Sequence, residues 1–171
     1  MFDREYSFKG KHAKMVTDLT SKFTMNGEEK HCFFETNFDV YLLAPIIGFL
    51  YQRKSGLDKT SDIYSKKVFG DKIMNSVYDL KFNYRLIMLL DKESEPNEEK
   101  RVEKAFYDIP NLEDEELYES YVRGGVEVLH ENLIGNIKTP DDYIKHLYEF
   151  LENFSNRYDE NLDISEVLEL N

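Results

Sequence analysis

The most apolar stretch of the chain is NFDVYLLAPIIGFLYQRK, residues 37–54, whose interior carries no charged side chain. A helix that is apolar on every side belongs in the middle of a bundle, and this run is shorter than the roughly 20 residues that cross a bilayer. Asn37 is the expected N-cap, with Asp39 in the first turn, where a negative charge suits the helix dipole. Pro45 predicts a kink, and Gly48 lets a neighbouring helix come close. We therefore expect the rest of the chain to pack around this central helix.

Apolar side chains at helical spacing predict five further helices. They cover residues 11–23, 71–90, 98–109, 112–133 and 140–158. Three of them follow start signals, because Asn97, Asn111 and Thr139-Pro140 each precede an acidic first turn. The last helix is expected to bury its whole apolar stripe, namely Tyr143, Ile144, Leu147, Phe150, Leu151, Phe154 and Tyr158. The sequence thus predicts an all-α bundle of about six helices in a single domain, residues 1–171, ending in a tail, residues 158–171, with a short terminal helix.

The segments before and after the central helix are less regular. Asn26-Gly27 is the strongest turn dipeptide in the sequence and predicts either a short hairpin near residues 23–34 or a plain interhelical loop. Residues 55–70 are polar and rich in helix breakers, so we expect an exposed connection there. Residues 1–9 are expected to be an extended lead-in.

Two adjacent glycines, Gly124 and Gly125, lie inside the predicted helix 112–133. Each costs about 1 kcal/mol relative to alanine in a helix interior, so some other interaction must offset their presence. A close helix crossing is the expected reason, and the region of Gly48 in the central helix is the expected crossing partner.

Composition indicates a globular protein, with 12 Phe and 12 Tyr among 171 residues and few Gly or Pro. Cys32 is the single cysteine, which excludes an intrachain disulfide and suits a reducing compartment. The first residues hold no apolar run typical of a signal peptide, and no segment is long enough to span a membrane. We therefore expect a cytoplasmic protein without membrane association.

Charge divides the chain into two unequal halves. Residues 1–90 carry 11 acidic and 14 basic side chains, whereas residues 91–171 carry 23 acidic and 8 basic, a net of −15. Three explanations are open: solvated helix faces, a docking surface for a basic partner or for head-to-tail self-assembly, and an acidic mimic of nucleic-acid phosphates that acts as an inhibitor. The residues expected to bind a partner are Glu113, Glu115 and Glu116, together with Lys66 and Lys67. The two lysines are expected to form a modest phosphate-contacting surface with lysines near the start of the chain, namely Lys9, Lys11, Lys14 and Lys22.

One pair of residues has a catalytic interpretation. Arg123 and His130 lie two turns apart on one helix, where His130 can exchange protons near neutral pH and Arg123 can stabilise charge on a phosphate. An arginine followed by a histidine in a small all-α domain resembles the motif of the HEPN ribonuclease superfamily. The resemblance implies cleavage of RNA by these two residues. The six intervening residues and Gly124 after the arginine depart from the usual pattern. The alternative is an ion-pairing arginine and a surface histidine.

Other motifs of catalysis and cofactor binding are missing. Glu127-x-x-His130 has the spacing of di-iron bundles, but the second such pair and two further inward glutamates are lacking. His31 and Cys32 are adjacent in an extended segment and therefore point to opposite faces, which does not suit a base and its nucleophile. No glycine-rich phosphate loop, serine elbow or cysteine pair for zinc occurs. We expect no cofactor and no metal.

A second resemblance extends over much of the chain. The stretches TNFDVYLLAPIIGFLYQRK, YRLIMLLD and YVRGGVEVLHENL are similar to small all-α accessory proteins of bacterial anti-phage and DNA-modification gene clusters. This resemblance implies a non-enzymatic subunit of a cytoplasmic complex that handles nucleic acid indirectly, through its protein partners.

Overall fold

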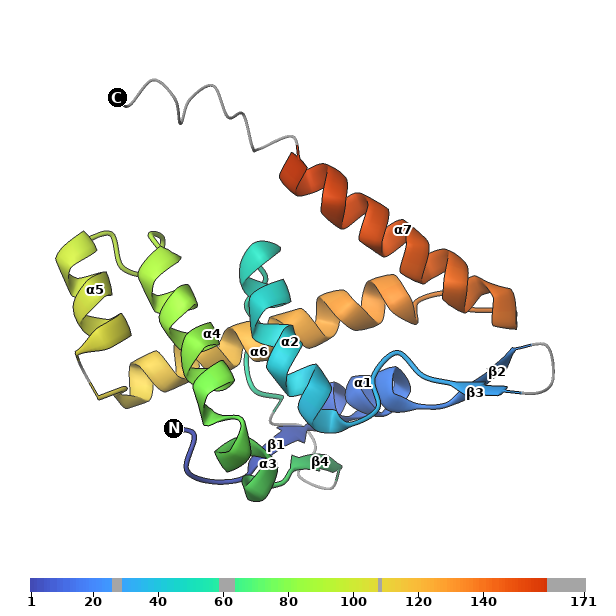
Figure 1. Ribbon diagram of the computed structural model, residues 1–171, viewed down its shortest axis with the longest axis horizontal. Coiled ribbons are helices and arrows are strands. Elements are labelled where there is room, and N and C mark those ends of the chain that lie inside the picture. Colours follow the sequence, from blue (N-terminus) through green and yellow to red (C-terminus); the bar gives the residue numbers. More distant parts are fainter. Residues whose placement is uncertain (26–28, 59–63, 108, 160–171) are drawn as a thin grey trace.

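Seven helices and four short strands make up the part of the chain that this computed structural model describes, residues 1–25, 29–58, 64–107 and 109–159. In chain order they are β1 (Tyr6–Lys9), α1 (Gly10–Thr20), β2 (Phe23–Met25), β3 (Glu29–His31), α2 (Asn37–Leu50), β4 (Ser65–Val68), α3 (Gly70–Asn75), α4 (Val77–Leu90), α5 (Glu98–Phe106), α6 (Leu112–Leu133) and α7 (Pro140–Asp159). Figure 1 shows α2 crossing the long α6, with α4 and α5 at one end of α6 and α7 at the other. The predicted all-α class and the central helix are confirmed.

Glycines allow α2 and α6 to approach each other closely where they cross, as the sequence predicts. A Cβ added at Gly125 would lie 1.8 Å from the carbonyl oxygen of Ala44, and one added at Gly48 would lie 2.1 Å from that of Tyr121. A Cβ at Gly124 would lie 1.8 Å from the carbonyl oxygen of Arg53. The backbones of the two helices are therefore in direct contact, which only glycine allows. The pairing of α2 with α6 is the most extensive in the molecule.

The boundaries of α2 differ from the prediction at both ends. Thr36, not Asn37, is the N-cap: its hydroxyl accepts from the backbone N–H of Asp39, whose carboxylate in turn accepts from the backbone N–H of Thr36. This reciprocal arrangement satisfies two otherwise unpaired donors. The amide of Asn37 instead donates to the carbonyl of Lys67. The helix ends at Leu50 rather than residue 54, and Gln52 adopts a left-handed conformation with φ of 52° just beyond it.

The first helix is shorter than predicted, and the hairpin alternative is confirmed. Helix α1 ends at Thr20, and Phe23 belongs to β2 rather than to the helix. Strands β2 and β3 pair antiparallel with Phe23 opposite His31. The turn dipeptide Asn26-Gly27 lies outside the described residues.

The segment 55–70 is not simply an exposed connection. Its end forms β4, which pairs antiparallel with β1 so that Tyr6 lies opposite Val68 and Lys9 opposite Ser65. Phe8 of β1 and Val68 of β4 are buried in the core. Pairing between segments about 60 residues apart has no local sequence signal, which is why the strand was not expected.

The helix predicted over residues 71–90 is broken into α3 and α4 at Ser76, whose φ of −115° and ψ of 24° are not helical. Asn97 and Asn111 cap α5 and α6 as predicted. Arg101 of α5 is buried and donates to the carbonyls of Leu89, Glu95 and Pro96. The guanidinium thus fixes α5 against the end of α4.

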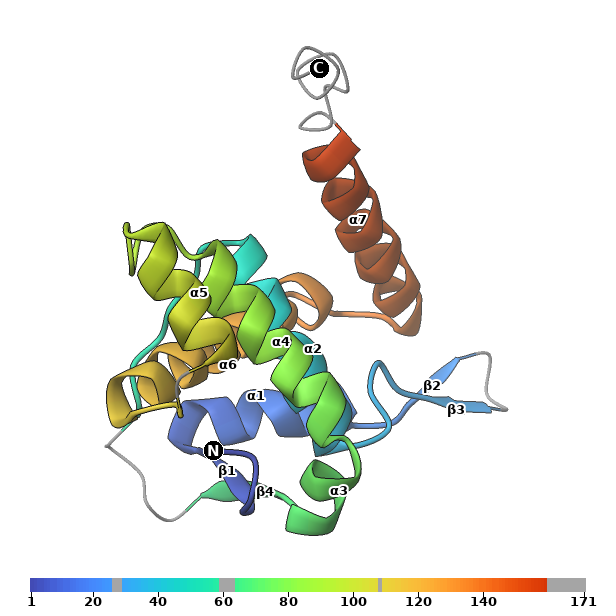
Figure 2. The same ribbon diagram turned by 60° about the vertical axis from the view of Figure 1, so that its left-hand side comes forward.

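Helix α7 begins at Pro140 as predicted, but most of its apolar stripe is not buried. Phe150 is the one apolar α7 residue that is fully buried among those described, while Ile144, Leu147 and Leu151 are exposed. Figures 1 and 2 agree that α7 stands away from α4 and α5. It contacts mainly α6 and β2, so only one side of the helix is covered. The side chain of Tyr158 and the predicted terminal helix lie outside the described residues.

Candidate functional site

Arg123, one half of the predicted catalytic pair, is buried in an internal network. Only 2% of its surface is exposed. Its Nε donates to the backbone carbonyl of Ser55 at 2.7 Å, and its terminal nitrogens form ion pairs with Glu116 and with Glu119. All three nitrogens of the guanidinium thus have protein partners, and the buried side chain is not presented to a phosphate in solution.

His130, the second residue of the predicted catalytic pair, lies seven residues further along α6. Its Nε2 is 2.9 Å from a carboxylate oxygen of Asp18 on α1, and the side chain is partly exposed. The structure therefore places His130 in a surface pair between α1 and α6, whereas Arg123 packs against Ser55.

A buried polar cluster that the sequence does not reveal lies between these two residues on α6. Glu127 Oε1 accepts from Ser55 Oγ at 2.6 Å and from Lys11 Nζ at 2.7 Å, and it lies 3.0 Å from His12 Nε2. Arg53 approaches the second carboxylate oxygen at 3.7 Å. Helices α1 and α6 and the segment after α2 therefore meet at one carboxylate.

The charge states in this cluster follow from burial and hydrogen bonding. Burial lowers the pKa of His12, and the hydrogen bond and attraction to Glu127 oppose this only in part. Burial raises the pKa of Glu127, but the hydrogen bonds from Lys11, Ser55 and His12 outweigh it, so its pKa lies below the usual value. At neutral pH the cluster thus holds a neutral imidazole, donating through Nε2, and an ionised carboxylate.

The cluster is not a catalytic triad, although it contains Ser, His and Glu. In a triad the imidazole uses one nitrogen for the hydroxyl and the other for the carboxylate. Here His12 Nε2 faces both Ser55 and Glu127, while His12 Nδ1 is buried without a partner. The Ser55 hydroxyl donates directly to the carboxylate, so we assign the cluster a structural role: it fastens the segment after α2 to α6.

The acidic residues expected to bind a partner are only partly available. Glu115 is largely covered and pairs with the amino group of Met1 and with Arg4, and Glu116 pairs with the buried Arg123. Glu113 is exposed and has no ion pair with a described residue. The N-terminal residues Met1 and Arg4 therefore cover Glu115, whereas Glu113 and Glu116 are exposed to solvent.

The two lysines are likewise engaged in local structure. Lys67 pairs with Glu5 at 2.8 Å, and Lys66 lies half-buried opposite Phe8 in the β1–β4 sheet. They alternate along a strand and therefore point to opposite faces of it. Lys11, which was expected to share their surface, pairs with Glu127.

Internal packing does not explain an aromatic surface on α4 and α5. We call it the α4–α5 surface; its residues line one groove of about 330 Å³, and they are Tyr78, Phe82, Arg85, Leu86, Leu89 and Phe106. The exposed fractions of Tyr78, Phe82 and Phe106 are 85%, 65% and 51%. A cluster of exposed aromatic side chains on a protein surface typically marks a site where another molecule binds.

Positive charge lies beside these aromatic rings. The guanidinium of Arg85 stacks over the ring of Phe106 with 5.7 Å between its central carbon and the ring centroid. Arg85 and Phe106 also line a second hollow together with Lys81. Neither Arg85 nor Lys81 forms an ion pair with a described carboxylate. The α4–α5 surface therefore combines apolar area with cations that have no acidic partner within the described chain.

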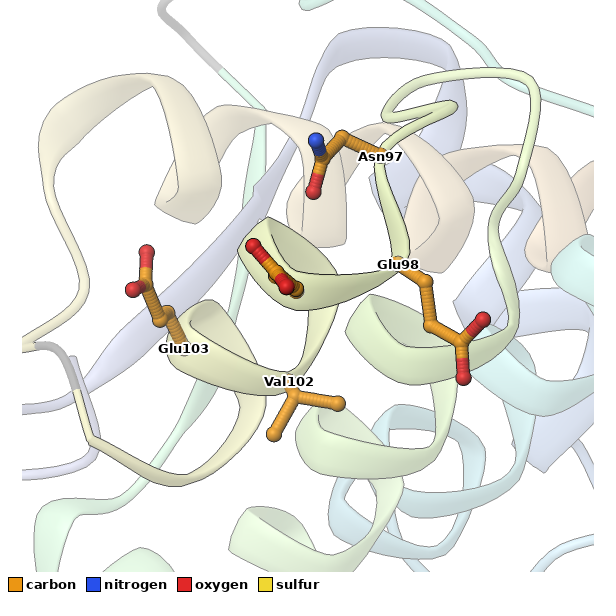
Figure 3. A pocket seen from close by; sticks show the side chains of 5 residues that line it. Asn97, Glu98, Val102 and Glu103 are labelled. Atoms are coloured by element: carbon orange, nitrogen blue, oxygen red, sulfur yellow. The ribbon is translucent and has the colours of Figure 1, made fainter.

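A second surface of α5 is negatively charged. Glu98, Glu99 and Glu103 line a wide, open hollow with Asn97 and Val102, and Figure 3 shows these side chains at close range. Glu98 and Glu99 occupy the first turn of the helix, where the helix dipole favours acidic residues. This hollow therefore needs no ligand to explain it.

The described residues contain no group of three or more His, Cys, Asp or Glu side chains arranged to hold a metal ion. None of their helices is both long and apolar enough to cross a bilayer. Comparisons with family models, with curated proteins and with solved structures find no match to this chain.

Proposed function

We propose that this protein is a non-enzymatic interaction subunit that binds an acidic amphipathic helix of a partner protein on its α4–α5 surface. The observation that carries the proposal is the groove lined by Tyr78, Phe82 and Phe106, whose rings are exposed within the described part of the chain. Aromatic residues and arginine are the side chains most enriched among the energetically dominant residues of interfaces.

The spacing along α4 favours a helix as the bound element. Tyr78, Phe82, Leu86 and Leu89 follow one another at intervals of four, four and three residues, so they form one stripe on the helix. The eleven steps from Tyr78 to Leu89, at 1.5 Å each, make this stripe about 16 Å long, which corresponds to three turns of a partner helix. In helix-in-groove docking, a partner helix lays its apolar face along a hydrophobic surface of this kind.

Charge favours an acidic partner on this surface. Although the chain has a net charge of −12, Arg85 and Lys81 leave the edge of the groove locally positive. Acidic side chains on the flank of the partner helix would pair with them. Pairing of this kind fixes register and speeds association more than it adds affinity.

The proposal keeps the role of an accessory subunit in a cytoplasmic complex that the resemblance to anti-phage accessory proteins implies, with nucleic acid contacted by other subunits. The expectation of a basic partner for the acidic half stays a separate prediction. Neither the ribonuclease nor the nucleic-acid mimic is favoured by a contact in the described residues, since Arg123 and Glu116 neutralise each other.

The test is purification of the native complex with a matched pair of variants. Phe82→Glu places a charge in the groove, whereas Phe69→Glu makes the same change at a residue with 64% exposure, against 65% for Phe82, that does not line the groove. The partner should be retained by Phe69→Glu and lost with Phe82→Glu, and binding of the identified partner should weaken with Arg85→Glu. Equal retention by both variants, or binding that is indifferent to Arg85→Glu, would overturn the proposal.

A further inference from the structure

A second groove lies between α4 and the central helix α2 and has a volume of about 380 Å³. We call it the α2–α4 groove, and its apolar lining residues are Phe34, Leu42, Leu43, Ile46 and Phe82. Asn83 also lines it and donates its amide to the carbonyl of Leu42 at 2.8 Å, which fastens α4 to α2 along the groove. Figures 1 and 2 show the two helices running side by side in the same direction.

The α2 side of this groove is a regular helical face. Asp39, Leu42, Leu43 and Ile46 follow one another at intervals of three, one and three residues, which places them on one side of the helix. Leu43 is 39% exposed, and Leu42 and Ile46 are half-buried. The sequence predicts that α2 is enclosed on every side, so this open apolar face needs an explanation other than internal packing.

The charged residues that line the α2–α4 groove within the described chain are both acidic. Asp39 and Asp79 lie in the first turns of α2 and α4, at the same end of the groove. The helix dipoles explain why acids stand there, but they do not explain the apolar face beside them. Asp79 is exposed and has no ion pair with a described residue. An occupant of the groove must therefore bring positive charge to this end.

The α2–α4 groove adjoins the α4–α5 surface at one residue. Phe82 lines both, and its ring is 65% exposed. On the α5 side of this ring the charged lining residue is Arg85, whereas on the α2 side the charged residues are the two aspartates. Two neighbouring apolar grooves thus have edges of opposite charge.

The size of the α4–α5 surface also requires a further contact. A helix lying on its stripe covers a footprint of about 16 Å by 10–12 Å, or about 200 Å². Stable interfaces bury about 800 Å² on each partner. A subunit held firmly in a complex therefore needs contacts beyond this surface, and the α2–α4 groove is an apolar area that adjoins it.

We infer that the α2–α4 groove binds a second apolar helix of the same partner, with a lysine or arginine placed against Asp39 and Asp79. This inference rests on the proposed function. The partner then has an acidic helix on one side of Phe82 and a helix with a basic residue on the other. Exchange of the two helices would oppose like charges in both grooves, so charge decides which helix occupies which groove.

Photocrosslinking from position 43 in the cells that produce the protein tests the inference separately from the proposed function. Leu57 is the matched control, because its exposure of 44% is close to the 39% of Leu43 and it does not line the groove. Position 43 should crosslink the same protein as position 82, at a different segment that contains lysine or arginine, and position 57 should not.

The possible failures of this experiment are distinguishable. If position 82 crosslinks an acidic helix and position 43 does not reach that protein, the proposed function stands and the inference is wrong. Crosslinks of position 43 to a second copy of this chain, or to a segment without a cation, also overturn the inference. If position 82 finds no common protein, the proposed function is wrong and the inference falls with it.

Charge reversal tests the expected cation on the partner. With the crosslinked partner purified, Asp79→Lys should weaken binding about 10-fold, because it opposes like charges at the interface. Asp71→Lys makes the same change in the first turn of α3, outside the groove, and should alter binding less than about 2-fold because salt screens exposed charges. Reversal of the partner's crosslinked cation to glutamate should restore binding to Asp79→Lys. Equal effects of the two substitutions, or no restoration, would overturn the inference.

Discussion

A single methyl group at the crossing of α2 and α6 should destabilise the protein. Alanine in place of Gly125 puts a Cβ 1.8 Å from the carbonyl oxygen and 2.6 Å from the carbonyl carbon of Ala44. Real Cβ contacts are essentially never closer than 3.0 Å, so the helices must separate locally by about 1 Å. Both obstructing atoms belong to backbone, and a side-chain rotation cannot relieve the clash.

The magnitude follows from two opposed effects. Alanine gains about 1 kcal/mol of helix propensity over glycine, while overpacking in a close-packed core costs about 1–3 kcal/mol and occasionally more. Because the clash involves the main chain of the central helix, we expect a cost of about 3 kcal/mol, the upper end of this range. Gly125→Ala should therefore lower the free energy of unfolding by about 2 kcal/mol once the gain in propensity is subtracted. For a chain of this size that corresponds to a fall in Tm of about 4–8 °C. Gly125→Leu should be at least as damaging.

The assay is thermal and urea unfolding followed by circular dichroism, since the chain contains no tryptophan. Gly56→Ala is the matched control, because a Cβ at Gly56 meets no atom within 4 Å, and it should change stability by less than about 0.5 kcal/mol. A Gly125→Ala variant as stable as the wild type, or more stable, would refute the direct backbone contact.

Three further predictions concern the polar network. Arg123→Ala should lower the free energy of unfolding by at least about 2 kcal/mol, because it removes the ion pairs with Glu116 and Glu119 and the hydrogen bond to the backbone of Ser55. Loss of RNA cleavage by this variant without loss of stability would instead favour the ribonuclease. Burial lowers the pKa of His12, so the folded state binds fewer protons than the unfolded state below about pH 6.5. The free energy of unfolding should therefore fall as the pH is lowered from 7.5 to 5.5, and it should fall less in His12→Gln; an equal fall in both proteins would contradict the assignment. Glu116→Lys should lower Tm by placing a cation against Arg123, whereas Glu113→Lys should cost at most about 1 kcal/mol through the helix dipole; equal effects would argue against the internal ion pair.

The sequence was most informative where a residue type has one physical explanation. Paired glycines inside a helix imply a close approach, and Gly124, Gly125 and Gly48 meet as predicted. Asparagine before an acidic turn implies a cap, and Asn97 and Asn111 fill that role. Such signals are local and do not depend on the rest of the fold.

Features that depend on distant parts of the chain could not be predicted. The β1–β4 pairing joins two segments that are separated in the sequence by α1, the β2–β3 hairpin and α2, and neither strand has a strong pattern of its own. The exposed apolar residues of α7, such as Ile144 and Leu151, have the same spacing as buried residues would have. The periodicity of a sequence shows that one face of a helix is apolar, but it does not show whether another element covers that face.

One feature of the sequence pointed to the buried cluster around Glu127. Glu127 lies in a run of α6 whose neighbours are all buried, and His12 lies beside buried apolar residues of α1. A charged residue in such a position needs a buried partner. The identity of that partner, together with Ser55, required the arrangement of three separate segments.

The central claim, that the α4–α5 surface binds a partner's acidic helix, is tested most directly by crosslinking in the cells that produce the protein. A photoreactive amino acid is placed at Phe82 in one strain and at Phe69 in another, and the crosslinked peptides are sequenced. We predict that position 82 crosslinks one protein, at an amphipathic helix with glutamate or aspartate on its flank, and that position 69 does not. Crosslinks of position 82 to varied proteins without a common acidic helix, or to the same protein as position 69 with equal yield, would contradict the account.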